Sequence, residues 1–227
     1  MDNILRTTDL NRQSPFGFSC QRCLTCCRCK KIQLNPYEIA RLADNRGMAI
    51  AEFIARYTTT GGTVLRFTGE GACVFLDAQG CAVHPDRPLV CRLYPLGRYV
   101  DYLGVETFAC IEPDKGCRGT LSDNGTIVHY LEEQEAAPFM HAADRYLDLL
   151  WHLLEMVKER QREPAHAASI DATVRAVAAG AGATATAPWI DMDQAVAEYC
   201  RRTGIPVPEE RDKKMMLHIK AVRKWAA

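Results

Sequence analysis

Five cysteines fall within ten residues near the start of the chain, in the run CQRCLTCCRC over residues 20–29. Four of them read C-x2-C-x2-C-C, at Cys20, Cys23, Cys26 and Cys27. Buried free cysteines behave as small apolar side chains and follow the period of a helix or strand, which this spacing does not. Thiolates three positions apart can instead close on one zinc ion or one corner of an iron–sulfur cube. The run therefore predicts the nucleus of a metal centre.

Three later cysteines are spaced so that they can join the run. Cys73 and Cys81 belong to two short apolar segments joined by a Gly-containing turn, which is typical of a β-hairpin. A hairpin brings two such thiols to the same end. Cys91 follows a proline-stiffened turn that can return it to that end.

The last three cysteines divide into two kinds. Cys110 and Cys117 lie in or beside a polar loop and are further candidate ligands. Cys200 lies among Ala195, Val196 and Tyr199 in a predicted helix. Since free cysteine is among the most buried residue types, Cys200 is expected in the core.

The spacing leaves two kinds of metal open. A structural zinc site uses two pairs such as C-x2-C with C-x2-C, and the chain has no second pair. A C-x2-C-x2-C triplet with a distant fourth thiol is typical of a [4Fe–4S] cluster. Adjacent Cys26 and Cys27 point in different directions, so they can serve different irons or different centres. We therefore predict one or two [4Fe–4S] clusters, with Zn²⁺ as the alternative.

The charge balance and the apolar runs of the sequence argue against some classes of protein. The chain has 28 Lys and Arg residues and 28 Asp and Glu residues, so its formal net charge is zero. This balance argues against a protein that coats nucleic acid, because such binding needs an excess of positive charge. The sequence has no apolar run long enough for a secretory signal or a membrane span. A cytoplasmic protein is expected, and in that compartment clustered thiols stay reduced and available to metal.

The predicted elements are short in the first half and helical in the second. Asn35-Pro36 starts a helix that ends near Asn45, and residues 50–57 form another. These two helices could read DNA, but the electrostatic footprint of a DNA binder is missing. We expect an α+β fold, with a small irregular cysteine-rich module over residues 1–120 and a helical region over residues 121–227.

The helical region has three parts. Helical periodicity runs from about Val128 to Gln161, with one apolar face formed by Tyr146, Leu147, Leu150, Leu154 and Val157. Residues 165–187 are rich in Ala and Gly and predict a linker. Two helices follow, over residues 191–203 and 209–225, and the last has a basic face.

The run at residues 20–27, followed by GACVFLDAQGCAVHPDRPLVCRLYPLG at residues 71–97, resembles the YkgJ-type cysteine-cluster family of zinc- or iron-chelating proteins. The likeness covers roughly residues 18–120. A flagellin lysine N-methylase contains a similar module and is thought to hold an iron–sulfur cluster. The resemblance implies that the metal ligands are Cys20, Cys23, Cys26, Cys27, Cys73, Cys81, Cys91 and one later cysteine, Cys110 or Cys117.

The resemblance also implies a role for two arginines, and the chain differs from the family pattern at two positions. Arg87 and Arg92 match arginines of the family and are expected beside the cofactor. The chain has His84 where the family often has Tyr, and neutral imidazole is a possible ligand. Cys29 is an additional thiol.

Three functions follow from these patterns. The first is an iron–sulfur protein that transfers electrons or supports a protein-modification reaction. The second is a zinc-stapled module that docks a partner protein through its basic last helix and Trp225. The third is a protein-modifying, methylase-like enzyme, which rests on analogy alone because the chain has no glycine-rich S-adenosylmethionine or dinucleotide loop.

Overall fold

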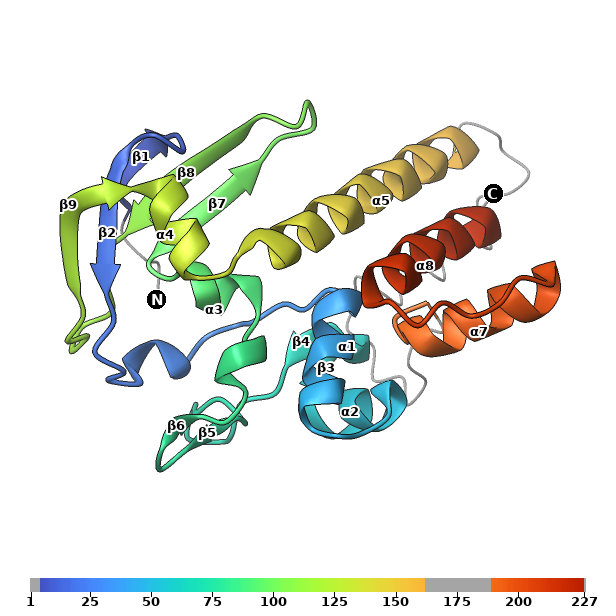
Figure 1. Ribbon diagram of the computed structural model, residues 1–227, viewed down its shortest axis with the longest axis horizontal. Helices are drawn as coiled ribbons and strands as arrows, with labels where there is room; N and C mark the ends of the chain where they lie inside the picture. The colour runs from blue at the N-terminus through green and yellow to red at the C-terminus, as the bar shows by residue number, and fades with distance from the viewer. Residues whose placement is uncertain (1–4, 162–188, 227) are drawn as a thin grey trace. The chain divides into compact units, whose positions relative to one another are not determined.

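The chain has an α+β fold with small antiparallel sheets and a helical C-terminal half (Figure 1). The computed structural model describes residues 5–161 and 189–226. The linker predicted over residues 165–187 lies outside these residues.

The backbone groups into two compact units that alternate along the chain. The first consists of Met1–Ile32 and Phe67–His141, and the second of Gln33–Arg66 and Ala142–Ala227. The boundary expected near residue 120 stays a prediction, although this grouping places Gln33–Arg66 with the C-terminal helices.

Two antiparallel sheets form the frame of the first unit. Strands β1 (Leu5–Leu10), β8 (Glu106–Ile111) and β7 (Leu96–Val100) pair in the order β1-β8-β7. Strand β2 (Pro15–Ser19) pairs with β9 (Thr120–Thr126). The sequence of β9, TLSDNGT, has no alternating apolar pattern, so its pairing with β2 could not be predicted from its own residues.

The rest of the first unit consists of short elements between these strands. The predicted hairpin is confirmed, since Leu76 pairs with Cys81, but it is shorter than expected and Cys73 lies before its first strand. These elements are η1 (Thr25–Cys27), β5 (Leu76–Asp77), β6 (Gly80–Cys81), η3 (His84–Asp86), α3 (Leu89–Leu93) and α4 (Ile127–Glu133).

An apolar core holds the first unit together. Phe16 of β2 is buried and packs edge-on against Tyr130 of α4, with ring centroids 4.9 Å apart. Phe108 of β8 and Ile127 of α4 are fully buried in the same cluster. Cys110 of β8 is also a buried member of this core.

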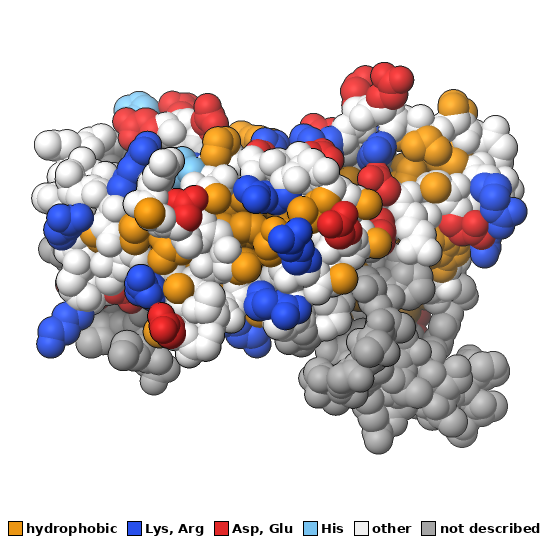
Figure 2. All heavy atoms as spheres, turned by 90° about the horizontal axis from the view of Figure 1, so that it is seen from below, with side chains coloured by type: hydrophobic (Ala, Val, Ile, Leu, Met, Phe, Trp, Pro, Cys, Tyr) orange, Lys and Arg blue, Asp and Glu red, His pale blue; other side chains and the backbone are white. Residues whose placement is uncertain are grey.

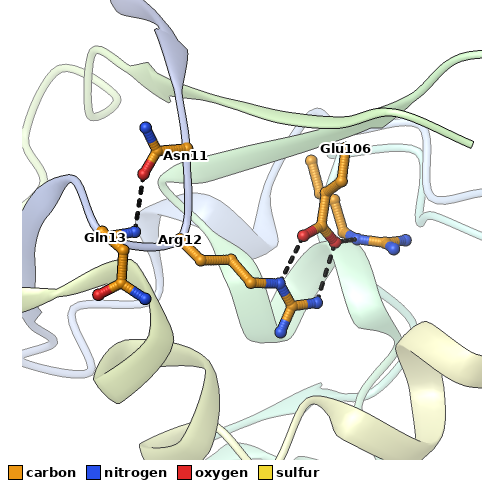
Figure 3. A network of polar contacts seen from close by, with 5 residues as sticks. Asn11, Arg12, Gln13 and Glu106 are labelled. Carbon is orange, nitrogen blue, oxygen red and sulfur yellow. Dashed lines mark hydrogen bonds and ion pairs between the residues drawn. The ribbon is translucent and has the colours of Figure 1, made fainter.

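A charged triplet ties the β1–β2 connection to the sheet (Figure 3). The Glu106 carboxylate accepts from Arg12 Nε at 2.6 Å and from the Arg98 guanidinium. Although partial burial raises the pKa of Glu106, the hydrogen bonds from Arg12 and Arg98 bring it below its usual value. Glu106 is therefore the shared acceptor that fixes both arginines.

The second unit is mainly helical. Asn35 caps α1 in a capping box with Glu38, as predicted, and Asp191 and Gly204 cap the two ends of α7. Helix α5 begins in the first unit and continues into the second. The elements are α1 (Pro36–Asn45), α2 (Ile50–Tyr57), β3 (Thr58–Thr59), η2 (Thr60–Gly62), β4 (Val64–Leu65), α5 (Ala137–Gln161), α7 (Met192–Thr203) and α8 (Arg211–Ala226).

The predicted apolar face of α5 is only partly correct. Tyr146 is buried, but Leu150 is 49% exposed and Leu154 is 46% exposed. Ala142 and Leu149 are buried beside Tyr146 instead. Helix α5 has apolar residues on two sides, and the contact of Tyr146 with α8 decides which side is covered.

Surface charge and helix character bear on binding to nucleic acid and on crossing a membrane. On the face seen in Figure 2, Lys and Arg side chains are scattered among neutral and acidic ones. None of the described helices combines the length and apolar character that crossing a bilayer requires.

A buried histidine links α5, α8 and the start of α7. His218 has no exposed surface, and its Nε2 lies 2.6 Å from the Trp189 carbonyl oxygen. A carbonyl only accepts, so Nε2 carries the proton and Nδ1 accepts from the Tyr146 hydroxyl at 2.9 Å. Both ring nitrogens are satisfied in the neutral form.

Acidification is expected to destabilise the second unit through His218. Burial lowers the pKa of His218 from 6.5 to about 4, although the Trp189 carbonyl raises it. The unfolded chain therefore takes up a proton below pH 6.5 that the folded unit does not bind until about pH 4. The free energy of unfolding should fall by about 1.4 kcal/mol per pH unit across this window, or about 3 kcal/mol in all.

Urea unfolding followed by tryptophan fluorescence measures this effect, because all three tryptophans (Trp151, Trp189 and Trp225) belong to the second unit. The His218→Gln variant has no group at this position that titrates in the window and should lose most of the pH dependence. An unchanged slope in that variant would contradict the assignment.

Candidate metal centre

The cysteine run is a strained loop. Arg22, Leu24 and Cys29 have φ values of 49°, 66° and 52°, in the left-handed region that non-glycine residues seldom adopt. Each costs roughly 1–2 kcal/mol relative to an ordinary conformation. Such strain is typical of functional sites, and here it turns the backbone between successive thiols.

A neighbouring segment is hydrogen-bonded to one end of the run. The Cys29 amide donates to the Gly71 carbonyl at 2.7 Å, and the Cys73 amide donates to the Cys27 carbonyl at 2.9 Å. Arg28 and Ala72 form an antiparallel bridge between these bonds. Cys73 is therefore fixed beside Cys27 by the backbone.

The loop over residues 112–119, called the late loop below, is hydrogen-bonded to the middle of the run. The Arg118 amide donates to Cys23 Sγ at 3.4 Å, and the Thr25 hydroxyl donates to the Gly116 carbonyl at 3.4 Å. The thiols of Cys117 and Cys23 are hydrogen-bonding partners. Of the two late cysteines, Cys117 thus lies beside the run, whereas Cys110 packs in the apolar core.

Five candidate ligands share one local geometry. In each, the sulfur accepts a hydrogen bond from the amide of the residue two positions later, which stabilises a thiolate over a thiol. Hydrogen bonds to the sulfurs also tune thiolate-bound metal centres. The five pairs are Cys20 with Arg22, Cys23 with Thr25, Cys73 with Phe75, Cys81 with Val83, and Cys117 with Gly119.

Cys23 is the thiol most prepared to ionise. Its pKa is lowered to about 6, first by the Thr25 hydroxyl and then by the amides of Arg118 and Thr25. A thiol with this pKa is a thiolate at neutral pH, and the thiolate is the form that binds metal.

Cys26 interacts electrostatically with several other thiols of the site. Its pKa is raised, first by its hydrogen bond with Cys27, then by burial and by the negative charge of Cys27 and Cys23. The pKa values of Cys81 and Cys117 are also raised. Burial is the largest cause in both, and the charge of Cys26 is one of the smaller causes. The pKa of Cys73 is likewise raised by burial and by Cys81. Among the candidate ligands, Cys26 is therefore a thiol whose charge bears on several others.

Helix α3 carries the remaining thiol of the motif and is anchored just past its C-terminal end. Cys91 is exposed on α3. The Tyr130 hydroxyl donates to the Tyr94 carbonyl at 2.9 Å, just past the end of the helix. His84 is exposed at η3, with its Nδ1 3.4 Å from the Arg87 guanidinium.

The two predicted arginines make structural contacts. Arg92 is only 2% exposed; it donates to the carbonyls of Arg87 at 3.1 Å and Gln134 at 2.8 Å and to that of Pro85. Arg87 donates to the Gln134 side chain at 2.8 Å and to the His84 carbonyl at 2.7 Å. These bonds shape the turn before α3, and contact of either arginine with a cofactor stays a prediction.

The chemistry of the donor set fits a metal bound by thiolates. All eleven cysteines lie in the described residues and none forms a disulfide there. Within the same residues, no three His, Cys, Asp or Glu side chains already form a group that could hold an ion. Binding therefore requires the side chains to turn toward a common point, and the loops that carry them are already held together by backbone bonds.

A glycine is required where the run meets the segment from Thr68 to Cys73. Gly71 has a φ of +76°, and a Cβ atom there would lie 2.7 Å from Cys29 Sγ. Gly71→Ala is expected to lower the free energy of unfolding by about 1–3 kcal/mol through backbone strain and this clash. Gly69→Ala is the matched control, since a Cβ atom at Gly69 meets nothing within 4 Å. Thermal unfolding of the two variants should separate them, and equal stability would count against this contact.

Sequence reasoning missed the residues that hold the loops together. Thr25 and Asp114 carry no motif of their own, whereas Lys30 adjoins the cysteine run and Gly71 and Tyr94 belong to the stretch over residues 71–97 that resembles the family. The position of Thr25 between two cysteines is also a signal, since a hydroxyl there can reach a neighbouring sulfur.

Comparison with known proteins agrees with this geometry. A search of curated proteins and a search of solved structures found no match to the chain. Residues 19–118 match the CxxCxxCC family, described as a putative zinc- or iron-chelating domain. That range contains the whole cysteine run, the hairpin, α3 and the late loop. The cysteine-bearing segments of the first unit are therefore similar to a domain family described as zinc- or iron-chelating.

Proposed function

We propose that the first unit binds an iron–sulfur cluster of the [4Fe–4S] type through cysteine thiolates. The proposed ligands are drawn from Cys20, Cys23, Cys26, Cys27, Cys73, Cys81, Cys91 and Cys117. Cys117 is preferred to Cys110 because it lies beside Cys23, whereas Cys110 is a core residue.

The observation that carries the proposal is that the sulfurs of five candidate ligands each accept a hydrogen bond from a backbone amide. A single structural zinc takes four ligands, so five sulfurs with this local geometry exceed what one ion uses. Iron–sulfur clusters are held by cysteine thiolates, and hydrogen bonds to sulfur tune their potential. The amide-to-sulfur bonds of five candidate ligands fit that requirement.

The cluster would supply one-electron transfer, and the residues of the chain would hold it and adjust its potential. Exposed thiols at Cys20 and Cys91 lie toward solvent, where a redox partner could approach. The role we propose is electron transfer, either alone or in support of a protein-modification reaction.

Anaerobic purification with metal and sulfide analysis tests the proposal. Four or eight irons per chain with matching sulfide, and a broad absorbance band near ~400 nm, are expected for one or two cysteine-ligated cubes. A colourless protein with zinc and no iron would overturn it.

A zinc-binding interaction module is the second candidate. Two zinc ions could share the candidate thiols, and helix α8 presents exposed Lys213, Lys220 and Arg223 to a partner. Deleting α8 is not a clean test because Met215, His218 and Ile219 are buried. Reversing the three exposed charges leaves this core intact. An unchanged set of co-purifying proteins after charge reversal would count against docking through α8.

A further inference from the structure

Three cysteine-bearing segments meet at one polar cluster, formed by Lys30, Tyr94 and Asp114. Lys30 follows Cys29 at the end of the run, Tyr94 follows α3, and Asp114 precedes Cys117 in the late loop. Lys30 Nζ lies 2.6 Å from Asp114 Oδ1, and the Tyr94 hydroxyl donates to Asp114 Oδ2 at 3.0 Å. The Asp114 amide in turn donates to the Tyr94 hydroxyl oxygen at 2.7 Å.

Asp114 also begins the turn that carries Cys117. The Cys117 amide donates to the Asp114 carbonyl at 2.8 Å, so both the side chain and the backbone of Asp114 are engaged. The Lys30 and Asp114 side chains are 21% and 20% exposed, which makes this ion pair more sheltered than an ordinary surface pair. The cluster therefore fixes the start of the turn relative to the cysteine run and α3.

The end of the same turn is fixed independently. The Arg118 amide donates to Cys23 Sγ, and a Cβ atom at Gly119 would lie 2.3 Å from the Phe18 ring. Phe18 packs edge-on against Tyr94, with ring centroids 6.2 Å apart. Between these two fixed points the position of Cys117 has little freedom.

From this arrangement we infer that Asp114 is a positioning residue for the metal centre, acting through Cys117. Its carboxylate binds no metal; it accepts from Lys30 and Tyr94 and so keeps the Cys117 thiol beside Cys23. The inference rests on the proposed metal-binding function and adds the residue that places the last ligand.

A double-mutant cycle with Cd²⁺ on the full chain tests this role. The variants are Asp114→Asn, Cys117→Ser and the double variant, and Glu112→Gln removes an exposed carboxylate of the same loop as the matched control. Asp114→Asn should weaken Cd²⁺ binding about 10–100-fold, as for residues that orient metal ligands. In the Cys117→Ser background, Asp114→Asn should weaken Cd²⁺ binding by less than about threefold, because the ligand that Asp114 positions is gone.

Two further readouts separate positioning from a general structural role. Cd²⁺ should protect Cys117 from alkylation in the wild type and in Glu112→Gln, but not in Asp114→Asn, while Cys23 and Cys26 stay protected. In Asp114→Asn, the thiolate-to-metal charge-transfer absorbance should fall by the contribution of one bound thiolate. Tyr94→Phe keeps the ring and removes one donor to Asp114. It should weaken Cd²⁺ binding in the wild-type background but not in the Cys117→Ser background, and this test holds even if Asp114→Asn folds poorly.

Equal weakening by Asp114→Asn in both backgrounds would overturn the inference, as would continued protection of Cys117 in a folded Asp114→Asn chain. If the wild type bound no Cd²⁺ through its thiols, this positioning role would be overturned, whereas the iron and sulfide analysis tests the proposed cluster separately.

Discussion

Cys26→Ser is expected to remove the bound metal. Cys26 lies in the cysteine run between Cys23 and Cys27, and its charge also bears on Cys81 and Cys117, so its loss affects several candidate ligands. Changes to residues that only orient ligands lower metal affinity about 10–100-fold, and the loss of a ligand should exceed that range. Because metal binding is coupled to folding, the variant should also unfold at a lower temperature.

Metal content per chain and thermal unfolding measure these two effects. Cys110→Ala is the matched control, since it removes a thiol from the same unit that packs in the apolar core. The control should keep its metal and lose only the stability expected for a small core change. Full metal content in Cys26→Ser, or metal loss in Cys110→Ala, would require a different ligand set.

Arg92→Met is expected to destabilise the first unit strongly. Methionine keeps the volume of the stem but leaves the carbonyls of Pro85, Arg87 and Gln134 without their donor. Arg92 also stacks on Phe139, with its guanidinium carbon 3.9 Å from the ring centroid. Buried acceptors without partners cost about 1–3 kcal/mol each, so a loss of about 3–5 kcal/mol in the free energy of unfolding is expected.

Urea unfolding followed by far-ultraviolet circular dichroism measures this loss. Arg28→Met is the control, because Arg28 is an exposed arginine of the same unit. Arg92→Lys should recover little of the lost stability, since one ammonium cannot reproduce the planar fork that serves separate carbonyls. Near-wild-type stability of Arg92→Met would mean that water replaces the guanidinium.

Arg92 has a consequence for the metal centre as well. Its bonds shape the turn that leads into α3, and α3 carries Cys91. If Cys91 is a ligand, the Arg92→Met variant should lose metal before it loses its fold. The arginine predicted from family resemblance to lie beside the cofactor thus has a measurable structural role.

The sequence by itself determined the local features of this protein. The C-x2-C-x2-C-C spacing indicated a metal centre because thiolate ligation depends on residue type and short-range spacing. The cap at Asn35, the turn of the β5–β6 hairpin and the αL end of α7 at Gly204 were also predictable. Each depends on residues within about four positions, where backbone and side-chain preferences dominate.

Only the tertiary structure decided between equivalent candidates. Cys110 and Cys117 are alike in sequence, but strand β8 carries Cys110 into the apolar core while the turn at Asp114 places Cys117 beside Cys23. Helix α5 has two apolar sides, and the side that meets His218 is the buried one. Strand β9 exists because β2 pairs with it. These outcomes depend on contacts between residues far apart in the chain, which local preferences do not encode.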